Sequence, residues 1–426
     1  MGTVLEGSIR KAGNKLRVTA QLIDVESLGH LWAQSYDREL EDIFKIQDDI
    51  AGKIAEALRV RLATTQEPLR RQTESIEAYT LYLKGRSLWN KRDREGVLGS
   101  LKLFQEAIKM DPDYARACTG LADAYHVAAF NDFMDRADGL VKSKEAAMKA
   151  LELDDTLAEA HASLGANLSD DLRYEQAQRE YKRAIELNPR YATAHHWYCV
   201  CLRELGRMKE AMEEIEKARE LDPLSPAITL NVGMTNFLNG RTDEAIAIYD
   251  KLIENEPSFA ASYYQRALCF MCKRMKERAY ADVEAYGKLV QNEDAYKISL
   301  AFLYGWFGER EKALSMIEEL IPKVGPDISD CYAVLGDRDE FFNWIDKAIS
   351  AKRLMVAYLR SSPFYDKVRE DPRFPENLQE VGPSLLSSTK STFRTCLGAG
   401  PTGPAKDSSA RTLRRAESEP ISKQAR

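Results

Sequence analysis

The sequence predicts a mainly α fold: an α-solenoid in which helix pairs form a right-handed superhelix, preceded by a small partial α/β domain. The main observation is a recurring acidic or amide residue that is usually followed by proline. It occurs at Asp111-Pro112, Asp154-Asp155, Asn188-Pro189, Asp222-Pro223 and Glu256-Pro257, in steps of 43, 34, 34 and 34 residues. A helical pattern with this period is typical of stacked helix–turn–helix units. Such solenoids usually act by holding other molecules.

The residues between these points repeat as well. Small residues recur at Gly165, Cys199 and Gly233, where they let the two helices of a pair approach closely. Gly206 and Gly240 lie where the first helix turns into the second, and proline ends most units because it cannot continue a helix. These offsets together resemble the tetratricopeptide repeat. The resemblance implies units that stack along one elongated core.

Extending the step in both directions predicts the domain organisation. We expect about seven units over residues 76–327, then a degenerate repeat and C-terminal cap over residues 328–380. The long first step implies about nine extra residues, which we place in the turn around Phe130–Gly139. Residues 383–426 are rich in Ser, Thr, Gly, Pro and Arg, so we expect a disordered basic tail that cannot bury enough apolar surface to fold.

Composition restricts the classes of partner. The net charge of the chain is −6, and it is more acidic still outside the basic tail, which argues against nucleic acid as a ligand. No run of about 18 apolar residues is present that could insert into a membrane. The start, Met1–Glu6, lacks the basic and apolar regions of a signal peptide. We therefore expect a cytoplasmic protein with protein or peptide partners.

The cysteines and histidines form no recognisable metal or catalytic pattern. Cys269 and Cys272 have a metal-like spacing, but no second pair is near in the sequence, so we interpret them as buried thiols. His161 and His195 occupy equivalent places in successive units, and we expect them to pack between units without a carboxylate partner. Phosphate-binding glycine loops, nucleophile elbows and kinase-type catalytic loops are also missing from the sequence. We expect no cofactor, no metal and no enzyme activity.

Residues 1–70 are predicted to form a separate unit. Val4–Arg10 and Lys15–Asp24 are rich in β-forming residues, with alternating apolar and polar residues in the second run, so the two predict a β-hairpin. His30–Tyr36 is expected to add a third strand. Apolar residues at every third or fourth position then predict an amphipathic helix over about Glu41–Ala63.

Several of these runs carry a second resemblance. Val4–Lys11, Leu16–Asp24, His30–Ala33 and Tyr36–Phe44 look like the end of a TolB-like domain, and Arg369–Phe374 looks like the usual close of proteins that join this domain to tetratricopeptide repeats. Those proteins are bacterial class III adenylate or guanylate cyclases, serine/threonine kinases and winged-helix regulators. The resemblance implies a bacterial signalling setting. It transfers no catalytic residue, because we expect the cyclase, kinase or DNA-binding module to lie outside this chain.

We interpret the chain as a non-catalytic protein–protein interaction scaffold. In tetratricopeptide repeats the first helix of each pair lines a concave groove, which would bind partner peptides or proteins. The alternative is the regulatory portion of a bacterial adenylate cyclase-related signalling protein whose catalytic domain is missing from this chain. The expected peptide-binding groove consists of residues on four first helices, namely His196, Val200, Arg203, Leu230, Met234, Phe237, Tyr264, Leu268, Met271, Ile298, Phe302 and Trp306.

The groove becomes more apolar towards its carboxyl end. Exposed apolar strips of this kind are uncommon on soluble monomers. We therefore give two possibilities equal weight. Either the strip is covered by the chain's own segment Leu354–Leu378 or by a second copy of the chain, or it binds an external partner.

Overall fold

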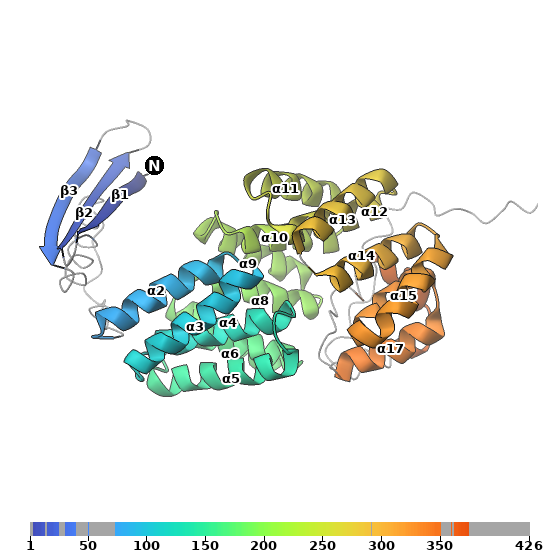
Figure 1. The fold of residues 1–426 in the computed structure, drawn as a ribbon, viewed down its shortest axis with the longest axis horizontal. Coiled ribbons are helices and arrows are strands. Elements are labelled where there is room, and N and C mark those ends of the chain that lie inside the picture. Colours follow the sequence, from blue (N-terminus) through green and yellow to red (C-terminus); the bar gives the residue numbers. More distant parts are fainter. Residues whose placement is uncertain are drawn as a thin grey trace, which may run out of the picture.

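A computed structural model defines residues 3–12, 15–24, 30–39, 50, 73–290, 292–350, 359 and 362–374. Most of this part of the chain is helical, and Figure 1 shows the helices stacked in successive pairs. The predicted α-solenoid with a small sheet before it is therefore confirmed. None of the helices in the described part is long and apolar enough to cross a membrane.

Seven helix pairs occupy the described residues between 76 and 324. The two helices of each pair contact one another, and each second helix also contacts the first helix of the next pair. The pairs are α2 (Ile76–Asn90) with α3 (Arg94–Met110), α4 (Ala115–Phe130) with α5 (Arg136–Leu153), α6 (Ala158–Asp170) with α7 (Tyr174–Leu187), α8 (Ala192–Glu204) with α9 (Met208–Leu221), α10 (Pro226–Leu238) with α11 (Thr242–Asn255), α12 (Ala260–Cys272) with α13 (Lys276–Val290), and α14 (Glu293–Trp306) with α15 (Arg310–Val324).

The recurring acidic or amide residues form the turns between units. Asp111, Asp154 and Asn188 end their helices, and each side chain accepts a hydrogen bond from the backbone N–H two residues further on, over 3.2, 3.0 and 3.1 Å. A short side-chain acceptor favours this turn. The spacing seen in the sequence is therefore the spacing of a local backbone structure.

The turn within each pair contains one residue with a left-handed backbone. The φ angle is 58°, 73°, 79°, 57° and 84° at Leu172, Gly206, Gly240, Arg274 and Gly308, which lie one period apart. Glycine adopts this conformation without strain, whereas leucine and arginine do not. The turn geometry is kept even in the units whose sequence lacks the glycine.

Small residues on the first helix receive an aromatic ring from the second. A Cβ atom added to Gly233 would lie 2.3 Å from Cε1 of Tyr249, and one added to Gly165 would lie 2.9 Å from Cε1 of Tyr181. Tyr249 and Tyr181 are 0% and 1% exposed. The close approach expected at these offsets is therefore the contact that closes each pair.

The extra residues of the long first step are distributed differently from our expectation. The α4 helix has 16 residues and α5 has 18, against 13 in α6 and 14 in α7. Both helices of this unit are thus lengthened, and the turn between them, residues 131–135, is only two residues longer than the turn of residues 171–173 between α6 and α7.

The N-terminal strands form one antiparallel sheet in the order β1 (Thr3–Ala12), β2 (Lys15–Asp24) and β3 (His30–Glu39). Leu16, Val18 and Tyr36 form a small buried cluster on it. The third strand runs to Glu39, beyond the expected end at Tyr36. Apart from residue 50, the helix expected over Glu41–Ala63 lies outside the described residues.

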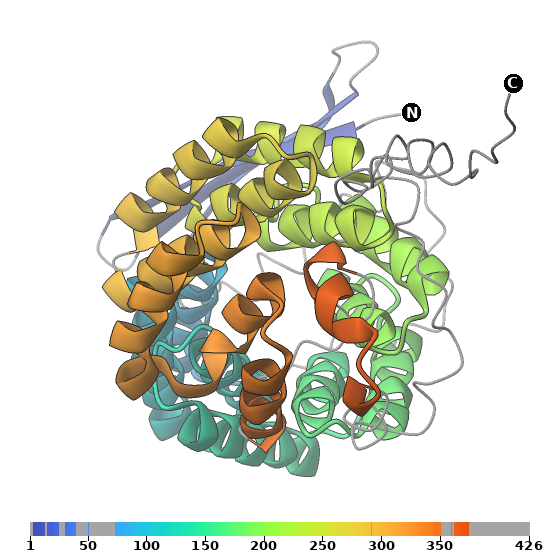
Figure 2. The same ribbon diagram turned by 90° about the vertical axis from the view of Figure 1, so that its right-hand side faces the viewer.

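The C-terminal elements lie inside the superhelix. After the turn η2 (Gly325–Ile328), the short helices α16 (Ser329–Leu335) and α17 (Arg338–Ser350) form a reduced pair. The turn η3 (Pro363–Tyr365) and α19 (Asp366–Arg369) follow. Figure 2 shows α2–α15 as a ring with α16 and α19 within it.

Candidate functional site

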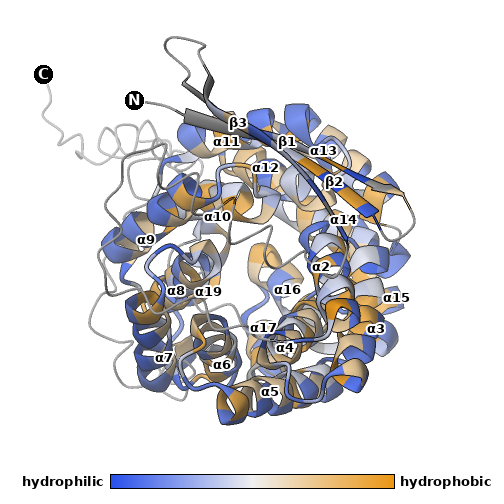
Figure 3. Ribbon diagram, turned by 90° about the vertical axis from the view of Figure 1, so that its left-hand side faces the viewer, coloured by the Kyte–Doolittle hydropathy of each residue, from blue (hydrophilic) through white to orange (hydrophobic). Residues whose placement is uncertain are grey.

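The first helices line the inside of the ring. Figure 3 shows α6, α8, α10 and α14 on the inner side, while α7 and α9 turn hydrophilic surfaces outward. All twelve expected groove residues lie on α8, α10, α12 and α14. Eight of them are buried, namely His196, Arg203, Met234, Phe237, Leu268, Met271, Phe302 and Trp306, and four are half-buried, namely Val200, Leu230, Tyr264 and Ile298.

The apolar half of this surface is covered by Phe364. Its ring meets the rings of Trp306 and Phe302 edge to face, with centroids 4.8 and 5.0 Å apart. It also lies 6.4 Å from the ring of Phe237, so one side chain connects α10 to α14. Phe364 is 2% exposed. Aromatic pairs in this geometry contribute beyond the area that they bury.

Polar contacts fix the covering segment on α16. The hydroxyl of Tyr365 donates to Asp330 over 2.7 Å, and Nζ of Lys367 donates to the carbonyl of Val334 over 2.6 Å. Arg369 donates to the carbonyl oxygens of Leu359 and Ser362. The cover lies within Leu354–Leu378, the segment expected in the intramolecular alternative. In this structure Phe237, Phe302 and Trp306 therefore contact the chain itself.

The other aromatic and aliphatic groove residues are engaged in the solenoid. The ring of Tyr264 packs at 5.3 Å on Tyr286 of α13, and the carbonyl of Met271 accepts a hydrogen bond of 2.7 Å from Nε1 of Trp306. Their role in binding a peptide stays a prediction. Val200 and Leu230 are half-buried on α8 and α10, and Leu230 also packs against the main hydrophobic core.

The amino-terminal half of the surface is charged. Arg203 is 2% exposed, and its Nη1 donates to the hydroxyl of Thr235 over 3.3 Å. His196 is 6% exposed. Burial, together with the charges of Arg92 and Arg203, lowers the pKa of His196 to about 3, so its ring is neutral at physiological pH.

A second set of charges lies on α2, on α4 and in the turn after α2, near Tyr191, which precedes α8. Nη1 of Arg86 lies 2.7 Å from the fully buried carboxylate of Asp123. The guanidinium of Arg92 lies 3.5 Å above the ring of Trp89. Burial, with the charge of Arg86, lowers the pKa of Arg92 to about 10, so Arg92 keeps its proton.

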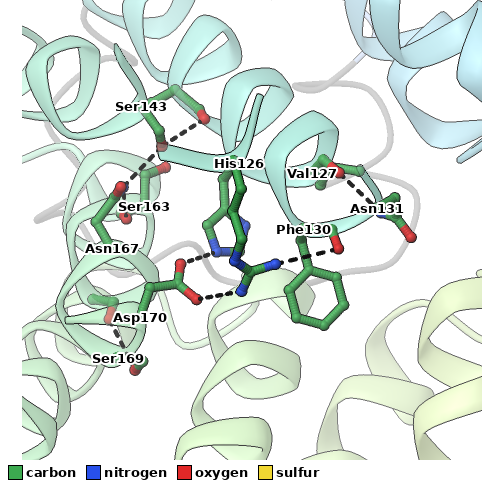
Figure 4. Close-up of polar contacts among 12 residues, drawn as sticks. His126, Val127, Phe130, Asn131, Ser143, Ser163, Asn167, Ser169 and Asp170 are labelled. Atoms are coloured by element: carbon green, nitrogen blue, oxygen red, sulfur yellow. Dashed lines mark hydrogen bonds and ion pairs between the residues drawn. The ribbon is translucent and has the colours of Figure 1, made fainter. Parts of the chain in front are cut away.

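His126 on α4 belongs to a third polar group (Figure 4). Its Nε2 lies 2.8 Å from Asp170 of α6, which also lies 3.9 Å from Arg136. Nearby, Nδ2 of Asn167 donates to the hydroxyl of Ser143 over 2.9 Å. These polar contacts connect α4, α5 and α6.

Our sequence reasoning missed Asp123 and His126, although a signal was present. Counting back from Val200 and Arg203 by one ordinary and one long step of 34 and 43 residues reaches these two positions. Charge at the groove positions of an early unit was therefore readable, but we applied the register only from α8 onwards.

The expectation that His161 and His195 lack carboxylate partners is wrong. Nδ1 of His161 lies 2.7 Å from Glu180, and Nδ1 of His195 lies 2.6 Å from Glu214. Glu214 on α9 therefore makes a contact within its helix pair as well as lying on the second helix. Each Nε2 meets a backbone carbonyl, that of Asp155 or Pro189, over 2.9 and 3.0 Å. These contacts tie the two helices of a pair to the turn before it.

The thiols do not form a metal site in the described part of the chain. Cys269 is 0% exposed, and burial raises the pKa of its thiol. No group of three His, Cys, Asp or Glu side chains among the described residues could hold a metal ion. The interpretation of Cys269 as a buried packing residue agrees with this environment.

Comparisons with known proteins identify the repeat. Two family profiles described as tetratricopeptide repeat match residues 170–230 and 213–258. A chain of the APC/C hetero-tetramer Cut9–Hcn1 is similar in structure, with a TM-score of 0.51 and 11% identity over 78% of this chain and 59% of that chain. This likeness concerns the fold alone.

Relatives in sequence match only part of their own length. "Putative adenylate cyclase 3" of Rhizobium meliloti (strain 1021) is 33% identical over 182 residues, which are 41% of this chain and 30% of that protein. The transcriptional regulator HilA of Salmonella typhimurium is 30% identical over 94 residues, 22% of this chain and 17% of the regulator. Residues 170–258 thus match the tetratricopeptide repeat, and the matches with these relatives span less than a third of either relative's length.

Proposed function

We propose that this chain is a non-catalytic interaction scaffold that binds partner peptides or proteins on the inner face of the superhelix. The observation that carries the proposal is the segment Pro363–Arg369 on that face. It is held by a buried aromatic side chain and by hydrogen bonds to backbone carbonyls, which are the contacts by which a peptide is recognised.

The helix pairs support this role because they fix the inner surface before a partner arrives. The first helices are held by rings such as Tyr181 and Tyr249, which fill the space beside Gly165 and Gly233. A surface fixed in this way loses little conformational freedom on binding. The half-buried Val200 and Leu230 are the apolar groups that we assign to the partner.

A selection experiment tests the proposal on the full chain. A random-peptide phage library is selected on the immobilised protein, and the recovered peptides are measured by fluorescence anisotropy. Leu230→Glu should abolish binding, because it places a charge on the inner face. Leu224→Glu is the matched control, since Leu224 is 89% exposed in the turn before α10. Recovered peptides that bind both variants as they bind the wild type would refute an inner-face site.

The alternative is a regulatory portion of an adenylate cyclase-related signalling protein, and the Rhizobium relative supports it. On this view the chain alone makes no cyclic nucleotide from ATP or GTP with Mn²⁺. It would instead change the rate of a cyclase catalytic domain added in trans. Turnover by the chain alone would contradict both proposals, and an unchanged cyclase rate would remove the alternative.

A further inference from the structure

The edge strand β1 can accept a further strand on its outer side. It pairs with β2 over its whole length, and among the described residues no strand pairs with its other edge (Figure 1). Proline and β-bulges are two devices that keep an exposed edge from pairing. β1 contains no proline, and the one register shift of the sheet lies between β2 and β3. Its outward backbone N–H and C=O groups are therefore arranged to bind another extended chain.

The apolar face of the sheet continues onto β1 beyond its cover. Val18 on β2 is 9% exposed, and the cluster to which it belongs is contacted by Ile50 from outside the three strands. Ile9 lies directly opposite Val18 in the register, yet it is 69% exposed. The position two residues before it on the same face is Gly7, which has no side chain. An added strand would cover Ile9 and would find space beside Gly7.

The polar face of β1 carries an unbalanced charge. Arg10 lies opposite Arg17 on β2, and Arg17 is already held by Asp37 through two hydrogen bonds. Like charges directly opposite one another on paired strands are destabilising. Arg10 is exposed and has no ion-pair partner among the described residues. Glu6, on the same face, accepts a hydrogen bond of 2.8 Å from the neutral amide of Gln21.

These features make β1 complementary to a second copy of itself. In an antiparallel pair with a two-fold axis at Ser8, Arg10 of each copy lies opposite Glu6 of the other, so that two ion pairs form. On the other face, Ile9 of each copy lies opposite Gly7 of its partner, where no side chain blocks it. A two-fold interface uses the same patch on both copies, so each favourable contact occurs twice.

We propose that two copies of the chain associate through β1 in this register, which joins their three-stranded sheets into one antiparallel sheet. This surface is separate from the inner face of the superhelix and goes beyond the proposed function. One strand pair makes a small interface, so we expect reversible association in the micromolar range.

Sedimentation velocity of the full chain at rising concentration tests the proposal. The wild type should change from monomer to dimer. Arg10→Glu and Glu6→Arg should each keep the chain monomeric, because like charges then face each other across the axis. The double variant should dimerise again, because both ion pairs return with reversed signs. Lys84→Glu makes the same charge change as Arg10→Glu at an exposed position of α2, and it should dimerise as the wild type does.

The single variants are informative because the sheet itself should tolerate them. Arg10→Glu places an opposite charge beside Arg17, so its loss of dimer would not come from a weakened strand pair. A chain that stays monomeric at every concentration would overturn the proposal. So would a dimer that Arg10→Glu leaves intact, or a double variant that stays monomeric.

A cross-link tests the position of the axis. Ser8→Cys should give a disulfide-linked dimer on mild oxidation, since the Cα atoms of opposite residues lie about 4.5–5.5 Å apart, within reach of a disulfide. The wild type is the blank, and Ala33→Cys, exposed on the other edge strand β3, should not cross-link. Cross-linking through Ala33→Cys as strong as through Ser8→Cys would contradict pairing through β1.

Discussion

Gly120→Ala should destabilise the amino-terminal units through one ring. Phe104 on α3 is 0% exposed and lies between the backbones of α2 and α4. A Cβ atom added to Gly120 would lie 2.5 Å from its Cε1, and one added to Gly85 would lie 2.6 Å from the same atom. The ring cannot retreat from one helix without approaching the other. We therefore expect the upper part of the overpacking range, about 2–3 kcal/mol.

The assay is urea unfolding followed by circular dichroism, with hydrogen exchange to locate the effect, because solenoid units can unfold separately. The control is Gly99→Ala, the same change on α3, where the nearest atom is a flexible Leu88 methyl at 3.1 Å. It should be neutral or stabilising by about 0.5–1 kcal/mol. Phe104→Leu should recover part of the cost of Gly120→Ala. The argument would be refuted if Gly120→Ala and Gly99→Ala changed the free energy of unfolding equally. It would also be refuted if the changes caused by Gly120→Ala and Phe104→Leu simply added in the double variant.

Three further predictions concern the turn, the buried ion pair and a histidine. Gly308→Ala should cost about 1–2 kcal/mol in urea unfolding from backbone strain alone, since φ is 84° and no atom lies within 4 Å of the added Cβ. Asp123→Asn and Arg86→Met should each cost about 3–5 kcal/mol, because each leaves one charge of a buried pair without its partner. Burial opposes the charge of His161, but hydrogen bonds to Glu180 and the Asp155 carbonyl outweigh it and raise its pKa. The stability that this pair provides should be present below about pH 6.5 and lost as pH rises through the folded pKa, so the unfolding midpoints of wild type and His161→Gln should differ at pH 6 and converge at pH 9.

The sequence was sufficient to predict the features that depend on contacts within one repeat unit. Asp111 and Asn188 mark turns because a short acceptor side chain is needed there, and Gly233 marks a helix contact because a larger residue would strike Tyr249. The left-handed turn residues at Leu172 and Arg274 carried no such signal. At these two positions the packing of the neighbouring helices imposes the left-handed turn. The sequence has no glycine there that would indicate it.

Contacts between elements were harder to foresee. Glu180 and Glu214 lie on second helices that look like solvated faces, and their histidine partners become visible only when the two helices of a pair are placed together. The contact of Phe364 with Phe237 and Trp306 depends on the curvature of the whole superhelix. Curvature is the sum of small rotations between successive units, which an offset pattern does not contain.

The two halves of the inner face therefore differ in what they contribute to the free chain. Burying Phe364 against Phe302 and Trp306 stabilises the fold, so selection for stability alone accounts for that half. Arg203 does the opposite, because its Nε is buried without a hydrogen-bond partner among the described residues. A methionine would fill the place of Arg203 without this cost.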